Sequence, residues 1–239
     1  MQRFLILLYA IAAYAAFLTV FLWFAAFLLG LNTIQNARLG LPIPLAAGFD
    51  VALIALFGLV HSVMARPGFK RVWTRIIPTA AERSTFVLQS SILLGTIIYH
   101  WQPIGGTVWC ADGMFAAALY AAFFGGMAVI VLSTFALDHF EFTGLRQAWS
   151  HLRGHSRATP EFRTPWLYRV VRHPLQLGLV LMLFCRPTMT VDGLLLAGVM
   201  LAYILIGLTC EERDLVREFG ADYRVYQKHV PKLVPRVFR

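Results

Sequence analysis

The C-terminal third of this sequence contains the stretch RHPLQLGLVLMLFCRPTMTVDGLLLAGVMLAYILIGLTCEERDL, Arg172–Leu215. It holds two apolar segments, Leu177–Phe184 and Val191–Leu208, with a break at Arg186-Pro187 between them. The first segment is too short to cross a hydrocarbon core of roughly 30 Å unless its helix begins near Pro174, and proline suits the first position of a helix. We therefore predict a transmembrane helical hairpin that folds back at this break.

The composition indicates where this hairpin resides. Apolar residues make up 59% of the 239 residues and charged residues 14%, and the mean hydropathy is +0.67. A soluble domain is roughly 45–50% apolar and about 25% charged. We therefore predict an all-α integral membrane protein with a single membrane domain over residues 1–239. The three cysteines form no CxxC pair and no metal-ligand spacing, so we expect free thiols and no metal site.

Four further apolar runs precede the hairpin. They are Phe4–Leu31, Leu45–Met64, Ser84–Tyr99 and Gly113–Leu137. The first is longer than the apolar core of a signal peptide, which is roughly 7–15 residues, so we interpret it as a retained span. We predict four transmembrane helices in residues 1–137, and a cytoplasmic segment, the hairpin and a cytoplasmic helical tail in residues 138–239.

The basic residues give the chain an orientation. If the N-terminus is cytoplasmic, every lysine and arginine of the 21 except Arg38 and Arg186 falls on the cytoplasmic side of these spans. This distribution follows the positive-inside rule and places both termini in the cytoplasm. The net charge of +9 therefore indicates membrane topology rather than a nucleic-acid partner.

Polar residues cluster at one end of the predicted hairpin. A helix that begins at Pro174 directs free N–H groups at the cytoplasmic interface, where they favour an anionic group such as a carboxylate. Gly178, one turn later, allows a ligand or a neighbouring helix to approach closely. The returning helix ends at Glu211-Glu212, so the hairpin brings these carboxylates to the same depth as Arg172 and His173.

Two tyrosines in the tail extend this cluster. Tyr223 and Tyr226 share a face if the tail is helical, and a tyrosine ring can bind a cation. Each feature alone has an ordinary explanation: a helix start, a solvated helix end or an interfacial aromatic anchor. Their order around one hairpin favours a ligand site. Elsewhere, Asp50 lies near the end of a span, where it either reaches the headgroups or faces the bundle as a functional candidate.

These motifs resemble a known family of membrane enzymes. The C-terminal pattern is similar to that of the isoprenylcysteine carboxyl methyltransferase superfamily, whose members bind S-adenosylmethionine at the cytoplasmic face; the matching residues are Arg172-His173-Pro174, Gly178, Glu211-Glu212, Phe219-Gly220, Tyr223, Tyr226 and Val230-Pro231. Earlier motifs resemble the nurim-related branch, namely His61–Pro67, Glu82–Thr85, Trp101–Pro103, Ser133–Phe135, Asp138–Phe140, Gly144–Gln147 and Pro187–Val191.

The resemblance implies a set of site residues. The S-adenosylmethionine contacts that it implies, all in residues 138–239, are His173, Pro174, Leu177, Gly178, Glu211, Glu212, Tyr223 and Tyr226. The superfamily usually has an aromatic residue where this chain has Gln176, so any contact there is made by an amide. For the acceptor side we predict His61, His139 or His173 as the base and Arg146 as a cation that favours a thiolate.

Within that branch the motifs are most similar to those of bacterial enzymes that methylate a small thiol. The resemblance therefore implies an S-adenosylmethionine-dependent thiol methyltransferase in a bacterial inner membrane, with a small thiol and membrane lipids as its partners. Two alternatives stay open. One is another acceptor, such as a prenylcysteine, a lipid amine or a different small thiol. The other is a non-catalytic structural or denitrification-linked membrane protein. The sequence assigns no oligomeric state.

Overall fold

A computed structural model of the protein describes residues 1–31, 37–155 and 162–236, and most of these residues are helical. Arg157 and Arg239, counted above among the basic residues, lie outside the described residues. The chain forms two compact units. The first comprises Met1–Ile104 and His139–Thr159, and the second comprises Gly105–Asp138 and Pro160–Arg239.

Four helices in the described ranges are long and apolar enough to cross a membrane. They are α1 (Gln2–Leu28), α2 (Ile43–Ala65), α5 (Gly113–Leu137) and α9 (Val191–His229). The protein is therefore an integral membrane protein. The predicted third span lies within α4 (Thr79–His100), which has the length but is less apolar, and α8 (Pro174–Phe184) has only 11 residues. Membrane crossing by α4 and by α8 stays a prediction.

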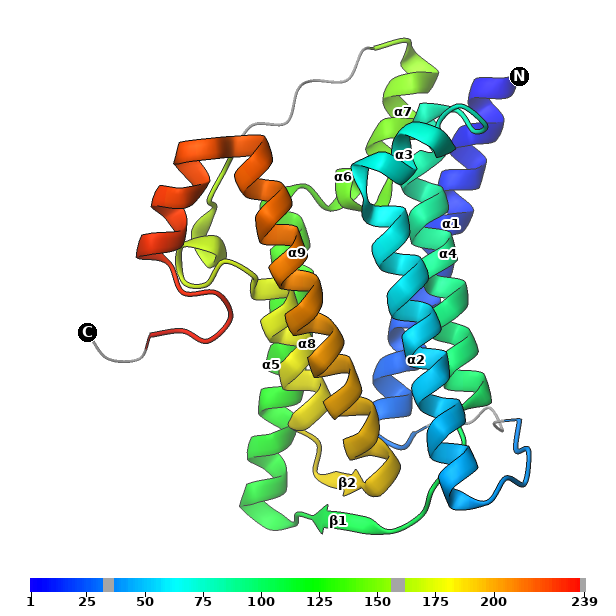
Figure 1. The fold of residues 1–239 in the computed structure, drawn as a ribbon, viewed down its shortest axis with the longest axis vertical. Coiled ribbons are helices and arrows are strands. Elements are labelled where there is room, and N and C mark those ends of the chain that lie inside the picture. Colours follow the sequence, from blue (N-terminus) through cyan, green and yellow to red (C-terminus); the bar gives the residue numbers. More distant parts are fainter. Residues whose placement is uncertain (32–36, 156–161, 237–239) are drawn as a thin grey trace. The chain divides into compact units, whose positions relative to one another are not determined.

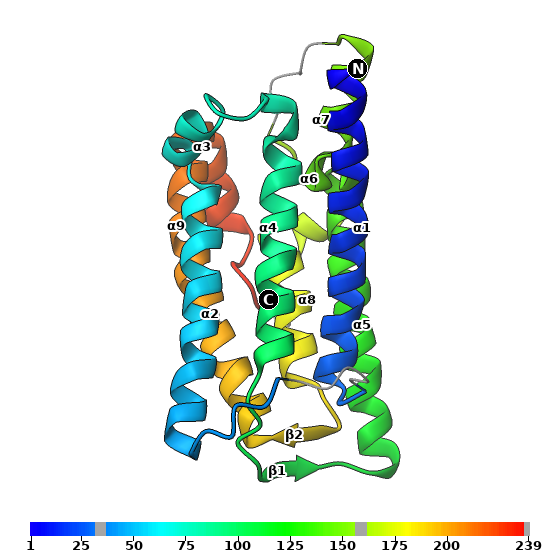
Figure 2. The same cartoon turned by 90° about the vertical axis from the view of Figure 1, so that its right-hand side faces the viewer.

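The first unit is a helical bundle in which α1 and α2 both pack against α4 (Figure 2). Its short helices are α3 (Pro67–Trp73), α6 (His139–Thr143) and α7 (Leu145–Arg153). Gly144, between α6 and α7, has φ +94°, and a Cβ atom there would lie 2.7 Å from the backbone nitrogen of Ser84. Glycine is therefore required at this position both for its backbone conformation and for close packing on α4.

The second unit is organised around the contact between α5 and α8. A Cβ atom on Gly126 of α5 would lie 2.8 Å from Cβ of Leu181, and one on Gly178 of α8 would lie 3.1 Å from the backbone nitrogen of Ile130. Paired glycines let two helix backbones approach closely in a membrane. The sequence grouped α5 with the three preceding spans, whereas in the structure it packs in this second unit.

The turn of the hairpin contains a two-stranded antiparallel sheet that the sequence did not indicate. Strand β1 (Thr107–Cys110) precedes α5, and strand β2 (Thr188–Thr190) connects α8 to α9 (Figure 1). The indole N–H of Trp109 donates to the backbone oxygen of Arg186 over 3.0 Å. Strands of three and four residues are too short for an alternating pattern to be recognised in a sequence.

Helix α9 joins the hairpin to the tail. Its first turn is capped by the hydroxyl of Thr190, which accepts a hydrogen bond from the backbone N–H of Gly193. Gly220 has φ +58° and ψ −121°, which interrupts the helix, and beyond it the chain folds back (Figure 1). The tail is therefore helical, as predicted, but it returns toward the start of α8 instead of continuing the line of α9.

Candidate functional site

The start of α8 is held by the C-terminal segment of the chain. Pro174 occupies the first turn of α8, as the sequence predicted. The two preceding residues donate backbone hydrogen bonds to this segment, from Arg172 to the oxygen of Pro231 over 2.9 Å and from His173 to the oxygen of Lys232 over 3.2 Å. The end of the tail is therefore hydrogen-bonded to the start of α8.

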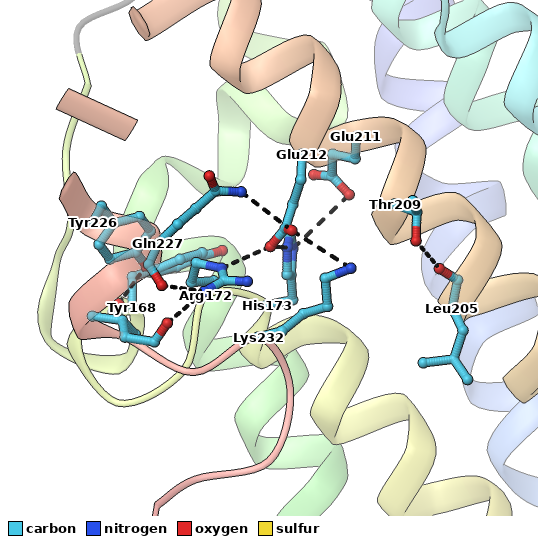
Figure 3. Close-up of polar contacts among 11 residues, drawn as sticks. Tyr168, Arg172, His173, Leu205, Thr209, Glu211, Glu212, Tyr226, Gln227 and Lys232 are labelled. Carbon is cyan, nitrogen blue, oxygen red and sulfur yellow. Dashed lines mark hydrogen bonds and ion pairs between the residues drawn. The ribbon is translucent and has the colours of Figure 1, made fainter. Parts of the chain in front are cut away.

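The carboxylate of Glu212 lies at the centre of the polar residues (Figure 3). Its Oε1 atom accepts from Nε of Arg172 over 2.7 Å and lies 3.1 Å from Nε2 of His173. Its Oε2 atom lies 3.3 Å from Nε2 of Gln227 and 3.5 Å from Nζ of Lys232. We call these five residues the Glu212 hub. The predicted meeting of the two ends of the hairpin is confirmed.

Arg172 connects three segments of the chain. Besides Glu212, its guanidinium donates through Nη1 to the backbone oxygens of Gln227 and Val230. These bonds join the start of α8, the end of α9 and the return of the tail. Because charge-assisted bonds to a buried carboxylate are among the stronger hydrogen bonds in proteins, Arg172 fixes the geometry of the hub.

The neighbouring carboxylate of Glu211 has a different environment. Its side chain is 50% exposed, whereas that of Glu212 is 11% exposed. Its Oε2 atom lies 4.0 Å from Nδ1 of His173, whereas Glu212 contacts the other ring nitrogen, Nε2 (Figure 3). The two adjacent carboxylates that the sequence treated as a pair therefore have separate roles. Glu212 holds the site together, and Glu211 faces solvent.

The charge states within the hub follow from burial and pairing. Burial lowers the pKa of His173 and outweighs the hydrogen bond and charge of Glu212, which act in the opposite direction. Burial raises the pKa of Glu212, but the hydrogen bonds from Arg172 and His173 and the charges of Arg172 and Lys232 outweigh it, so the net shift is downward. At pH 7, His173 is therefore neutral and the neighbouring Glu212 is ionised.

This charge state fixes the tautomer of His173. A carboxylate can only accept hydrogen bonds, so the neutral imidazole must carry its proton on Nε2 and donate to Glu212. Nδ1 then carries the lone pair and faces Glu211 across 4.0 Å. The site consequently presents two acceptors, a ring nitrogen and a carboxylate, side by side.

An aromatic cluster borders the hub. The rings of Tyr223 and Tyr226 lie on one face of the tail with centroids 5.7 Å apart, as predicted, and both contact Phe162. The hydroxyl of Tyr226 donates to the backbone oxygen of Tyr168. Tyr223 is 2% exposed, and within the described part of the chain its hydroxyl has no hydrogen-bond partner. Burial raises the pKa of Tyr223, so this hydroxyl stays protonated.

The remaining predicted cofactor residues lie on α8. Pro174 and Gly178 are buried, while Gln176 and Leu177 are partly exposed. The close approach that Gly178 permits is made by α5. The described contacts of Gly178 therefore indicate that a small residue is needed here for close packing of α8 against α5.

The other predicted catalytic residues belong to the first unit. Nδ1 of His61, on α2, lies 2.9 Å from Oγ of Ser90, and its ring packs between Phe57 and Phe86. Nε2 of His139, on α6, lies 2.9 Å from the hydroxyl of Tyr14. Arg146 is exposed on α7. These residues occupy three different helices and contact different partners, while His173 lies in the second unit.

Two members of the hub were missed by the sequence analysis. Gln227 lies one residue after Tyr226, and Lys232 follows the Val230-Pro231 motif, but neither position was assigned a role. The only available signal was their proximity to these motifs. A lysine or glutamine in a polar tail is ordinary, and the contact with Glu212 exists only because the tail folds back at Gly220.

Comparison with known proteins reveals several relatives along the full length of the chain. A protein from Bradyrhizobium diazoefficiens named methanethiol S-methyltransferase 2 is 44% identical, covering 99% of this chain and 92% of the relative. A methanethiol S-methyltransferase from Mycobacterium tuberculosis is 38% identical, covering 98% of each chain. A Nurim homolog from Drosophila pseudoobscura pseudoobscura is 30% identical, covering 70% of this chain and 69% of the relative. No protein-family model matches the sequence, and no solved structure matches the chain.

Proposed function

This chain belongs to the methanethiol S-methyltransferase family, and on that premise we propose that it transfers the methyl group of S-adenosylmethionine to methanethiol, producing dimethyl sulfide. The relatives' names support the acceptor, since six of them carry it at 37–44% identity. The observation that carries the donor site is the Glu212 hub, which holds Nδ1 of His173 toward the carboxylate of Glu211.

The residues present fit a donor of this chemistry. S-adenosylmethionine carries an ammonium, a carboxylate, a sulfonium and an aromatic base. Glu211 and Nδ1 of His173 supply acceptors for an ammonium, and the rings of Tyr223 and Tyr226 supply faces for a cation or a base. The buried hydroxyl of Tyr223 needs a hydrogen-bond partner, and a bound ligand would provide one. When bound, the donor supplies a methyl group activated by its positive sulfur.

The contacts implied by the resemblance divide into two groups. We propose that His173, Glu211, Tyr223 and Tyr226 touch the donor directly. Glu212 acts through His173, because its two oxygens are already engaged by the four other members of the hub. Pro174 and Gly178 shape the start of α8, and Gln176 and Leu177 are proposed to border the donor from that helix.

The protein must remove the thiol proton and align the two reacting sulfur atoms. The nucleophile in such a transfer is the thiolate, which attacks the methyl carbon in line with the bond that breaks. A thiolate and a sulfonium become two neutral thioethers, so charge is lost at the transition state, and a site with little water favours that change. We propose His61, His139 or His173 as the base and Arg146 as a cation that favours the thiolate.

Gas analysis of membranes tests this function. Membranes that contain the full chain receive methanethiol and S-adenosylmethionine, and headspace gas chromatography measures dimethyl sulfide. We expect production by the wild type and a loss of about 100-fold or more in Glu212→Gln, which weakens the hub. Glu218→Gln, an exposed position on the same helix, is the matched control and should keep full activity. Cofactor binding by the wild type without dimethyl sulfide would refute the acceptor and direct the search to larger or lipid acceptors.

We also propose that both termini are cytoplasmic in a bacterial inner membrane. Cys110 is an exposed free cysteine on β1, in the segment that the charge distribution places outside. In intact spheroplasts we expect a membrane-impermeant maleimide to label the wild type and not Cys110→Ser. In the Cys110→Ser background, Lys228→Cys in the tail should be labelled only after the membrane is opened. Labelling of position 228 in intact spheroplasts would reverse the proposed orientation.

A further inference from the structure

The Glu212 hub contains more positive than negative charge. Arg172 and Lys232 are both cations beside a single carboxylate, and His173 is neutral. The Lys232 ammonium lies 3.5 Å from Oε2 of Glu212, whereas a close bond between such groups is about 2.7–2.9 Å. Its side chain is 33% exposed. Lys232 is therefore held near the hub by a loose ion pair and is able to meet a second anionic group.

Glu211 presents the opposite charge nearby. In Figure 3 the ammonium of Lys232 and the carboxylate of Glu211 both lie to the same side of His173. Glu211 and Nδ1 of His173, 4.0 Å apart, offer two acceptors to one donor group. An ammonium has three N–H donors, so it can satisfy both. The site thus presents a cation for a carboxylate and a pair of acceptors for an ammonium.

The hydroxyl of Tyr223 is a separate sign that a ligand belongs here. Tyr223 is 2% exposed, and its hydroxyl has no hydrogen-bond partner among the residues that the structure describes. The charges of Glu211, Glu212 and Arg172 act on this phenol, and its ring lies 5.7 Å from that of Tyr226 in the aromatic cluster. Because a buried hydroxyl without a partner is costly, a polar ligand atom at this position would stabilise the site.

We propose that Lys232 and Glu211 recognise the amino-acid end of the methyl donor, with Lys232 binding its α-carboxylate and Glu211, together with Nδ1 of His173, binding its α-ammonium. The inference rests on the proposed use of S-adenosylmethionine. It makes His173 a binding residue, and His61 and His139 are then the proposed bases for the thiol proton. It also makes Lys232 a specificity residue, since a donor without the carboxylate gains nothing from this cation.

Binding measurements with two ligands test the proposal independently of activity. The full chain in lipid nanodiscs is titrated calorimetrically with S-adenosylmethionine and with decarboxylated S-adenosylmethionine, which keeps an ammonium but lacks the carboxylate. We expect Lys232→Met to weaken binding of the first ligand by about tenfold or more and to leave binding of the second unchanged. Lys228→Met removes the same charge from an exposed position of the tail and should change neither affinity. Glu211→Gln should weaken both ligands, since both carry an ammonium.

The outcomes separate this inference from the function on which it rests. Equal weakening of both ligands by Lys232→Met would mean that Lys232 acts only through Glu212, and would overturn the inference while leaving the proposed donor intact. Equal affinity of the wild type for the two ligands would overturn it as well. Failure of the wild type to bind either ligand would reject the proposed donor and the inference together.

Discussion

Each unit of the molecule contains a buried carboxylate that holds chain segments together, but the partners differ. In the first unit, Asp50 is 0% exposed and its Oδ1 accepts from the backbone nitrogen of Gln102 over 3.0 Å. The amide of Gln102 in turn bonds the backbone at Leu39, Ala37 and His100. We call this network the Asp50 anchor. In the second unit, Glu212 is surrounded by an arginine, a histidine, a glutamine and a lysine.

The difference shows how a structural carboxylate can be distinguished from one that supports chemistry. The hydrogen bonds named for the Asp50 anchor reach backbone groups, and they hold loops at the ends of helices. In the Glu212 hub, the carboxylate contacts side chains, and three of these partners are titratable. A half-exposed carboxylate, that of Glu211, lies beside the hub. Clusters of this kind concentrate at functional sites. The sequence analysis assigned Glu212 to the ligand site and left Asp50 between a headgroup contact and a functional candidate.

The largest effect should come from removing the cation of the hub. Arg172→Met breaks the bonds to Glu212 and to two backbone oxygens, and leaves a buried carboxylate short of one cation. Breaking a buried pair in this way costs several kcal/mol, so we expect affinity for S-adenosylmethionine to fall about 100-fold or more. Calorimetric titration measures the change. Arg169→Met, an exposed arginine three residues earlier, is the control; similar losses in both variants would contradict the role of the hub.

An intermediate effect, on stability alone, is expected at the Asp50 anchor. Asp50→Ala leaves the backbone N–H of Gln102 without its acceptor, and an unsatisfied buried donor costs about 1–3 kcal/mol. We expect a lower melting temperature in detergent, with affinity for S-adenosylmethionine within about twofold of the wild type. Asp112→Ala, at the start of α5, makes no side-chain cap and should leave the melting temperature unchanged. A folded Asp50→Ala protein that no longer bound the donor would remove the distinction between the two carboxylates.

The smallest effect should be the pH dependence of the hub near neutrality. Burial holds the pKa of His173 below its ordinary value of about 6.5. Because the folded-state value is the lower one, the unfolded chain takes up the proton first, and stability falls as the pH drops below about 6.5. Donor affinity requires a neutral His173, so it should stay constant from about pH 8 to pH 7 and fall only as the pH passes below the lowered pKa.

Titration of donor affinity against pH checks this sign. Arg172, Glu211, Glu212 and Lys232 surround the imidazole, and none has an ordinary pKa between about 5 and 8. His173→Gln keeps an N–H for Glu212 but cannot be protonated, so the fall at acidic pH should disappear in this variant. Affinity that rises on acidification would show that the imidazolium is the binding form.

Much of the fold and part of the site could be predicted from local features of the sequence. Pro174 marks the start of a helix because proline fixes φ and lacks the N–H that a first turn does not need. The spacing of Tyr223 and Tyr226 predicts a shared helical face, and that face exists. The apolar runs predict membrane helices because the hydrocarbon core demands about 20 apolar residues. These conclusions depend only on neighbours in the chain.

Other features depend on which distant segments meet. Glu211 and Glu212 are adjacent and chemically identical, but successive residues on a helix point about 100° apart, so the packing of α9 buries one and exposes the other. Gly178 is explained by its contact with α5, which only the tertiary arrangement reveals.

The sequence by itself determined the membrane class, the hairpin, its helix start and the family, because hydrophobic length, proline geometry and motif identity are local properties of the chain. The tertiary structure alone decided that the tail turns back at Gly220 and brings Gln227 and Lys232 to Glu212. A single glycine with positive φ changes the direction of the chain that follows it. The resulting contacts join residues that share no sequence motif or periodicity. The physical reason is that burial and charge pairing are properties of an assembled site, which no run of neighbouring residues contains.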